Sequence, residues 1–252
     1  MSKRIVILTA SVGEGHVAAG AALEDSLRRG APDVEVERFD VMAWTPWPFR
    51  LVYDTGYGTV VTHGPYVYGS MYDAVDREGP RARACRQAVQ RAATGGLTAR
   101  LRRLRADAII HTHFLPPETI AMDRPDRRPR AKQFVVVTDL LVHSLWVQPG
   151  VERFYVASEP AAAVVARRGA DADRVRVFGI PIRRQFGEPA DRASLRRKHD
   201  LPPEAGPVVL LLCGGAGFGP VAALWQELQR LDRPVQLVAV AGRNERLRRR
   251  LV

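Results

Sequence analysis

A histidine stands where a glycine-rich turn meets a predicted helix. The segment Gly13-Glu14-Gly15-His16 follows the apolar run Ile5–Thr9 and precedes the amphipathic run Val17–Arg29. Glycines between a strand and a helix let the backbone approach a phosphate, whose charge the helix N-terminus stabilises. The helix dipole also disfavours a protonated imidazole there, so we expect His16 to be neutral and able to accept a proton. These features predict a phosphate-bearing ligand beside a general base; the alternative is a histidine that only caps or packs the turn.

The same turn also fits the G-x-G-x-x-[GA] pattern of dinucleotide-binding domains. The residues up to Val12 separate the predicted strand from Gly13, which makes the loop longer than a tight dinucleotide turn. The acidic residue Asp40 lies further along than the roughly 20 residues at which a ribose-binding carboxylate is expected. An oxidoreductase with a nucleotide cofactor is therefore the weaker alternative.

Further polar side chains follow two other predicted strands. His111 and His113 close one strand, and Asp139 and His143 follow another. Alternate residues of a strand point to one face, so these four residues are an alternative zinc site. We favour an interpretation without metal, in which Asp139 and His143 position an acceptor and support the base. Otherwise they form a local hydrogen bond that orders the loop.

Composition indicates a globular protein with anionic partners. The 252 residues are 46% hydrophobic and carry 38 Lys and Arg against 27 Asp and Glu, a net charge of +11. This balance favours nucleic acid, acidic lipid or phosphorylated ligands, or it reflects an arginine-rich proteome. Cys85 and Cys213 give neither a disulfide framework nor a thiolate zinc motif. No apolar run reaches the length of a membrane span, so we expect a cytoplasmic protein whose membrane contact is peripheral.

Apolar and amphipathic segments alternate along the chain, which predicts a doubly wound α/β fold. Most apolar segments are continuous Val, Ile and Leu runs, as in parallel strands covered on both faces. The predicted strands are Ile5–Thr9, Val34–Phe39, Ala108–His111, Phe134–Thr138, Phe154–Ala157, Val175–Phe178, Val208–Cys213 and Val235–Val240. The predicted helices are Val17–Arg29, Arg81–Arg105 with an interruption at Gly95-Gly96, Pro160–Arg168, Arg192–His199, Val221–Leu231 and the helix opening at Asn244.

Two stretches interrupt this alternation. Residues 43–79 contain no clear strand but hold five of the six tyrosines, and residues 179–206 are rich in proline and charge. After the second stretch come one strand, the glycine loop Gly214-Gly215-Ala216-Gly217 and one further strand. Two strands cannot make a covered sheet domain. We therefore expect either an incomplete second domain or two strands that join the first sheet.

Four ordered segments resemble the family of monogalactosyldiacylglycerol synthases and processive diacylglycerol glucosyltransferases. They cover the first 183 residues, and Gly214–Gly217 extends the resemblance beyond them. The segments are Ser11-x-Gly13-x-Gly15-His16, Val137-Thr138-Asp139 with His143 and Trp146, Phe154-Tyr155-Val156-Ala157, and Gly179-Ile180-Pro181-Ile182-Arg183.

The resemblance implies a GT-B glycosyltransferase that moves a hexose from UDP-glucose or UDP-galactose to diacylglycerol with inversion. It implies a lipid-acceptor domain at residues 1–183, a linker at 184–206 and the start of a truncated UDP-sugar donor domain at 207–252. No cofactor and no metal are implied, and the partners are the acceptor lipid, the UDP-sugar and an anionic membrane surface, without nucleic acid. A peripheral location at the inner face of the cell membrane follows from this interpretation.

The resemblance also implies roles for individual residues. The catalytic residues would be His16, as the base, and Asp139. The donor would be bound by Gly13, Gly15, Arg183, Gly214, Gly215 and Gly217. The acceptor or the membrane would be contacted by Trp44, Trp47, Tyr66, Tyr68, His143 and Trp146.

Several of these residues have a second interpretation. Arg183 forms either a donor contact or an interdomain salt bridge, and Trp146 is either a stacking surface or a core residue. The aromatic residues from Trp44 to Tyr72 bind the acceptor at the membrane interface, pack as core or stack on nucleic-acid bases. The eight arginines of 81–105 form a solvated helix face or attract anionic lipid.

Family members continue into a complete second domain. We therefore expect weak or absent turnover by the 252-residue chain alone. The alternative from another functional class is a non-catalytic lipid- or nucleotide-binding module.

Overall fold

The computed structural model describes residues 2–51, 77–202, 206–215, 217 and 219–251. The chain divides into two compact units. Described residues up to Phe186 form the first unit, and those from Gly187 onward belong to the second. The tyrosines Tyr66 and Tyr68 lie outside the described residues, so their predicted roles stay predictions.

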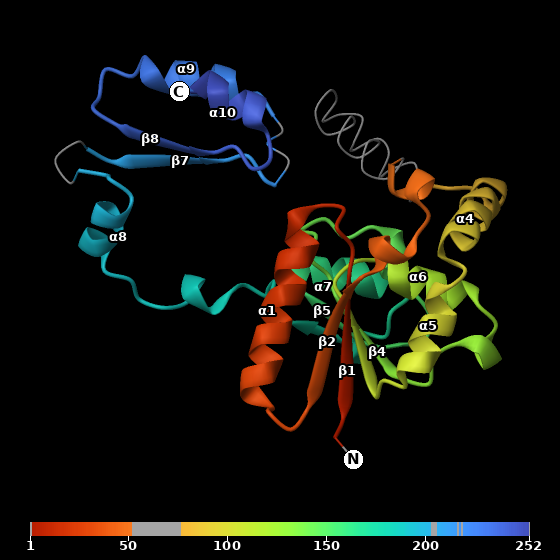
Figure 1. The fold of residues 1–252 in the computed structure, drawn as a ribbon. Helices are drawn as coiled ribbons and strands as arrows, with labels where there is room; N and C mark the ends of the chain where they lie inside the picture. The colour runs from red at the N-terminus through yellow and green to blue at the C-terminus, as the bar shows by residue number, and fades with distance from the viewer. Residues whose placement is uncertain (1, 52–76, 203–205, 216, 218, 252) are drawn as a thin grey trace. The chain divides into compact units, whose positions relative to one another are not determined.

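A parallel sheet of six strands forms the first unit, in the order β2-β1-β3-β4-β5-β6 (Figure 1). Most residues of its central strands β1, β3 and β4 are buried, which explains their continuous apolar runs. The predicted α/β class is confirmed. The strands are β1 (Arg4–Thr9), β2 (Glu35–Asp40), β3 (Ala108–His111), β4 (Lys132–Val136), β5 (Val151–Val156) and β6 (Val175–Val177).

Helices pack against this sheet and against one another. Helix α1 (Glu14–Gly30) packs on β1 and β2, and α7 (Glu159–Arg167) packs on β5 and β6. The Ser158 side chain accepts a hydrogen bond from the Ala161 N–H and so caps α7. The predicted helix at 81–105 is two helices, α4 (Pro80–Thr94) and α5 (Leu97–Leu104), separated at Gly95-Gly96 as the sequence indicated.

Helix α6 (Leu115–Met122) was not predicted. Pro116 and Pro117 give this segment the composition of a loop, yet both lie in the first turn of the helix. Amide groups there have no partner within a helix, so proline removes nothing that the helix needs. Helices α4 and α5 both pack on α6, which begins two residues after His113.

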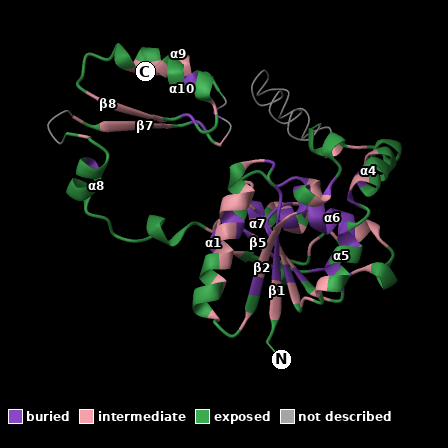
Figure 2. Ribbon diagram, viewed as in Figure 1, coloured by how far each residue is buried: buried purple, intermediate pink, exposed green. Residues whose placement is uncertain are grey.

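The core of the first unit lies on the sheet and beneath the loops that follow its strands (Figure 2). Val6, Ile7, Leu8, Ile109 and Val135 have no solvent-accessible surface. Trp146 belongs to the same kind of environment, in a cluster with residues of β4, β5 and α7. The core therefore extends under the loop after β4 and supports the residues that the sequence singled out there.

The second unit contains a separate sheet of two parallel strands, β7 (Val208–Leu212) and β8 (Gln236–Val240). These strands do not join the first sheet, so that alternative is wrong. The sheet packs against α9 (Val221–Gln229), which contacts α10 (Glu245–Leu251). The short helices η5 (Arg184–Phe186) and α8 (Arg192–Lys198) lie within the predicted linker.

Close contact between α1 and the sheet explains Gly20. A Cβ atom at this position would overlap the Cγ2 atom of Thr9. We expect Gly20→Ala to lower the free energy of unfolding of the first unit by about 1–3 kcal/mol, the usual cost of overpacking. Urea unfolding followed by circular dichroism measures this difference. Gly15→Ala is the matched control, because a Cβ atom there has no described atom within 4 Å. Equal stability of the two variants would contradict the explanation.

Candidate functional site

The site residues come from the loops that follow β1, β3 and β4. These three strands are neighbours in the sheet, and the chain order reverses direction between β1 and β3. Ligands of doubly wound sheets bind at such a reversal, outside the carboxyl ends of the strands. The fold thus brings together His16, Thr112, His113, Thr138 and Asp139, which lie far apart in the sequence.

The turn after β1 has the geometry that its glycines predict. Gly13 precedes α1 with φ 106°, a left-handed conformation that side chains rarely adopt. Gly15 is exposed in the first turn of α1, and a Cβ atom there would meet no described atom. The backbone of this turn is therefore accessible to a ligand, while the predicted donor contacts of Gly13 and Gly15 stay predictions.

His16 is half-buried in the first turn of α1, and its ring is anchored at one nitrogen. Its Nδ1 atom lies 3.0 Å from the backbone oxygen of Thr112 and 2.6 Å from Oγ1 of Thr138. Because a carbonyl oxygen can only accept, Nδ1 carries the hydrogen. Nε2 then has the free lone pair, and it has no hydrogen-bond partner among the described residues. In this tautomer Nε2 can accept a proton.

The surroundings of His16 keep it neutral at physiological pH. Burial lowers the pKa of the imidazole below its ordinary value of 6.5, while the charge of Asp139 and the hydrogen bond to Thr112 offset part of that shift. A neutral base beside a carboxylate is suited to take a proton, because the carboxylate stabilises the resulting imidazolium.

Asp139 is held by the indole of Trp146. The Nε1–H of Trp146 donates to Oδ2 of Asp139 over 2.8 Å, and Nε2 of His143 lies 3.8 Å from the same oxygen. His143 also accepts a hydrogen bond at Nδ1 from the Leu145 N–H, at 3.3 Å. Trp146 is fully buried, as the core alternative for this residue proposes, so it offers no surface for stacking on a sugar or a lipid.

His113 fills the space between His16 and the core. Its ring meets that of His16 edge-on with 4.6 Å between centroids, and it stacks on Phe114 at 4.2 Å. The Leu115 N–H donates to its Nδ1 atom over 3.0 Å. Burial lowers the pKa of His113 well below its ordinary value, and the neighbouring imidazoles of His16 and His143 lower it further. His113 is therefore a neutral packing partner of His16.

His111 does not join this group. It lies fully buried within β3, where Nε2 faces Oε1 of Gln133 at 3.2 Å. Burial lowers its pKa to about 3. Over the described part of the chain, no three His, Cys, Asp or Glu residues gather in a way that could hold a metal ion. The alternative of a zinc site from His111, His113, Asp139 and His143 therefore gains no support.

The remaining predicted acceptor and donor residues among those described in the first unit make no hydrogen bond or ring contact with His16. Trp47 is 67% exposed, whereas Trp44 is half-buried and packs on Phe39. The guanidinium of Arg100 lies 5.4 Å from the ring centroid of Trp44, within cation–π distance. Arg183 is exposed just before η5.

In the second unit, the glycine loop packs against the loop that follows β8. Gly217 has φ 65°, and a Cβ atom there would overlap the backbone oxygen of Ala241. Asn244 donates through Nδ2 to the Gly217 oxygen, and the Arg243 N–H donates to the Gly215 oxygen. Close contact between loops thus accounts for Gly217. The predicted donor contacts of Gly214, Gly215 and Gly217 stay predictions.

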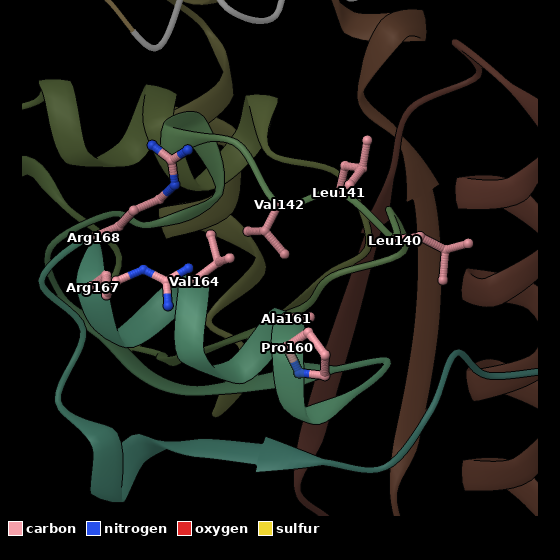
Figure 3. Close-up of a pocket in the computed structure, with 8 residues that line it drawn as sticks. All are labelled: Leu140, Leu141, Val142, Pro160, Ala161, Val164, Arg167 and Arg168. Carbon is pink, nitrogen blue, oxygen red and sulfur yellow. The ribbon is translucent and has the colours of Figure 1, made fainter.

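A pocket of about 390 Å³ opens between the loop after β4 and helix α7 (Figure 3). The loop that carries Asp139 and His143 forms one wall, and two arginines at the end of α7 lie at the pocket. Leu140 and Leu141 are 74% and 85% exposed, unusual values for two adjacent leucines. The lining residues are Leu140, Leu141, Val142, Pro160, Ala161, Val164, Arg167 and Arg168.

The pocket and the two threonines beside His16 were not predicted from the sequence. Of the two threonines, only Thr138 stands in a segment that the sequence singled out, directly before Asp139. That position, two residues after β4 and beside a candidate catalytic carboxylate, is the signal that could have identified Thr138. No helix in the described ranges combines the length and apolarity needed to cross a bilayer.

Comparison with known sequences identifies the family. A family model of monogalactosyldiacylglycerol (MGDG) synthase matches residues 16–182. The chloroplastic monogalactosyldiacylglycerol synthase of Spinacia oleracea is 31% identical over 97% of this chain, and the probable synthase of Glycine max is 30% identical over 99%. A processive diacylglycerol beta-glucosyltransferase of Bacillus licheniformis is 27% identical over 98% of the chain.

The chain spans 49% of the length of both plant relatives and 63% of the bacterial one. Among solved structures, Anabaena HepE in complex with UDP-glucose aligns with a TM-score of 0.54 at 12% identity, over 98% of this chain and 65% of that one. This likeness shows the fold, which is that of GT-B glycosyltransferases. With a family match that covers most of the chain, the protein belongs to the monogalactosyldiacylglycerol synthase family.

Proposed function

We propose that this protein transfers a hexose from UDP-galactose or UDP-glucose to the free hydroxyl of diacylglycerol, with inversion. Membership of the family supports the substrate classes. The observation that carries the proposal is the anchored imidazole of His16, whose Nδ1 atom is occupied by Thr112 and Thr138. The nitrogen left available, Nε2, can accept the proton of an acceptor hydroxyl.

In this mechanism the acceptor oxygen attacks the anomeric carbon as its proton moves to Nε2 of His16. The bond from the anomeric carbon to the diphosphate breaks, and UDP leaves with the electron pair. Asp139 stabilises the imidazolium that forms, since its charge favours the protonated ring. His113 is buried and neutral, so it does not compete for the proton. The exposed backbone at Gly15 and the N-terminus of α1 lie next to His16, where a phosphate charge would be stabilised.

Radiolabelled sugar transfer tests this proposal. The protein is incubated with labelled UDP-galactose or UDP-glucose and vesicles that contain diacylglycerol, and the lipids are separated by chromatography. We expect a labelled glycolipid, formed slowly by the 252-residue chain alone, whose anomeric configuration, read from the proton coupling constant, is opposite to that of the donor. Binding of UDP-sugar and lipid without transfer would instead support the non-catalytic binding module.

We further propose that the pocket between the loop after β4 and α7 takes one acyl chain of the acceptor. Its walls are apolar, and it begins beside the loop that carries Asp139 and His143. The guanidinium groups of Arg167 and Arg168 suit the phosphates of the surrounding lipid headgroups. Leu140 and Leu141 expose enough apolar surface to enter the interface of a bilayer.

Leu141→Asp tests the pocket, because a side chain that is 85% exposed can be replaced without loss of folding. We expect the wild-type chain to sediment with anionic vesicles, and more strongly when they contain diacylglycerol. The variant should lose most of the increment due to diacylglycerol, about tenfold in affinity, because one buried leucine contributes roughly 1.5 kcal/mol. Phe178→Asp is the matched control, since Phe178 is 76% exposed and does not line the pocket. Equal losses in both variants would contradict a specific pocket.

A further inference from the structure

Two polar atoms contact Nδ1 of His16, and neither belongs to a carboxylate. The backbone oxygen of Thr112 and Oγ1 of Thr138 lie 3.0 Å and 2.6 Å from Nδ1, and the hydroxyl of Thr138 donates to the Thr112 oxygen over 3.2 Å. The carboxylate of Asp139, whose charge acts on His16, accepts from the indole of Trp146 instead. Orientation of the imidazole therefore comes from a hydroxyl and a peptide group.

Only one placement of hydrogens satisfies this arrangement. With a hydrogen on Nδ1, the Thr112 oxygen and Thr138 Oγ1 both act as acceptors, and the Thr138 hydroxyl is free to donate to Thr112. Without it, the lone pair of Nδ1 would face the lone pairs of a carbonyl oxygen 3.0 Å away. The contacts of Thr112 and Thr138 with the ring therefore stabilise the tautomer of His16 that carries a hydrogen on Nδ1.

Thr112 also fixes the backbone of His16. Its Oγ1 donates to the His16 backbone oxygen over 2.9 Å, and its own N–H donates to the Leu8 oxygen of β1 over 3.0 Å. The end of the sheet thus holds both the main chain and the ring of the histidine. A base held on both sides keeps its direction as it gains and loses a proton.

We propose that Thr138 is a positioning residue, which together with the Thr112 carbonyl selects the Nδ1–H tautomer of His16 and aims Nε2 at the acceptor hydroxyl. In many enzymes a carboxylate performs this task on a histidine base. Here Asp139 contributes its charge, and the hydroxyl of Thr138 supplies the direction. The inference rests on the proposed function of His16 as base.

The tautomer of His16 can be read without any turnover. Histidine labelled with ¹⁵N gives separate Nδ1 and Nε2 signals in long-range proton–nitrogen correlation spectra, and His16→Asn assigns them. We expect the wild type to show a protonated Nδ1 and an unprotonated Nε2 above its pKa. Thr138→Val should lower the pKa and shift part of the population to the other tautomer, because Thr112 alone then accepts from Nδ1–H. Thr138→Ser should restore both values.

Thr45→Val is the matched control, because the Thr45 hydroxyl donates to the Met42 oxygen, outside this network. Signals of His16 that do not differ between wild type and Thr138→Val would overturn the positioning role. In the transfer assay, Thr138→Val should lower kcat about five- to tenfold with little change in KM. A shifted tautomer with unchanged kcat would keep the positioning role and overturn His16 as the base, so the two failures are distinguishable.

Discussion

His16→Asn lowers kcat for sugar transfer by at least about 10²-fold, the usual contribution of a general base. The amide of asparagine can still donate to Thr112 from the place of Nδ1, so the local fold keeps its anchor. What the variant lacks is a proton acceptor in the place of Nε2. Because ground-state binding is retained, KM for the donor and the acceptor should change little.

The measurement is transfer of labelled sugar to diacylglycerol by wild type and variant, with circular dichroism to compare their folding. If the 252-residue chain turns over too slowly, the same pair of residues is compared in a chimera with the C-terminal half of a plant relative. His199→Asn is the matched control, since His199 is exposed on the second unit. A loss smaller than tenfold would return His16 to the role of a packing residue.

The elements of this fold were largely predictable because the sheet is parallel and buried. Ile5 to Leu8 and Val135 to Val137 are continuous apolar runs, and such runs identify strands covered on both faces. Helix α6 escaped prediction because local composition at Pro116-Pro117 outweighed the position of the prolines in a first turn. The sequence also could not decide whether β7 and β8 join the first sheet, because pairing between strands depends on contacts far apart in the chain.

Site residues could be predicted from the sequence only where they lie close together in the chain. The order of residues after the first strand is enough to identify Gly13, Gly15 and His16 as candidates. The anchors of the ring carry no such pattern, because Thr112 and Thr138 lie 96 and 122 residues from His16. One of them acts through its backbone oxygen, which every residue possesses. The role of Trp146 as the hydrogen-bond donor to Asp139 likewise depends on a loop geometry that spacing alone does not fix.

Acidification below pH 6.5 should destabilise the first unit strongly, through its buried histidines. The pKa of His111 falls from 6.5 to about 3 on folding, and that of His113 also falls well below 6.5. Below pH 6.5 these histidines bind protons in the unfolded chain but stay neutral in the folded chain. The contribution of these histidines to the free energy of unfolding is therefore fully present above pH 6.5. It is lost as the pH falls toward their pKa values in the folded protein. Each histidine contributes a slope of about 1.4 kcal/mol per pH unit within that window.

Urea unfolding at several values between pH 7 and 5 measures this slope. Trp225→Phe removes the one tryptophan of the second unit, so fluorescence then reports on the first unit through Trp44, Trp47 and Trp146. The interval above pH 5 is informative because ordinary carboxylates titrate mostly below it, which leaves the histidines as the groups that change charge.

His111→Gln assigns the effect to a residue, since glutamine keeps a polar group near Gln133 but does not titrate. We expect this variant to reduce the slope by roughly 1.4 kcal/mol per pH unit, the contribution of one imidazole. His199→Gln, an exposed substitution in the second unit, is the control. An unchanged slope in His111→Gln would contradict the assignment of the effect to the His111 imidazole, which is fully buried in β3. Because His111 and His113 are buried and neutral, neither is suited to exchange a proton with a substrate. The half-buried His16 is the imidazole suited to that exchange.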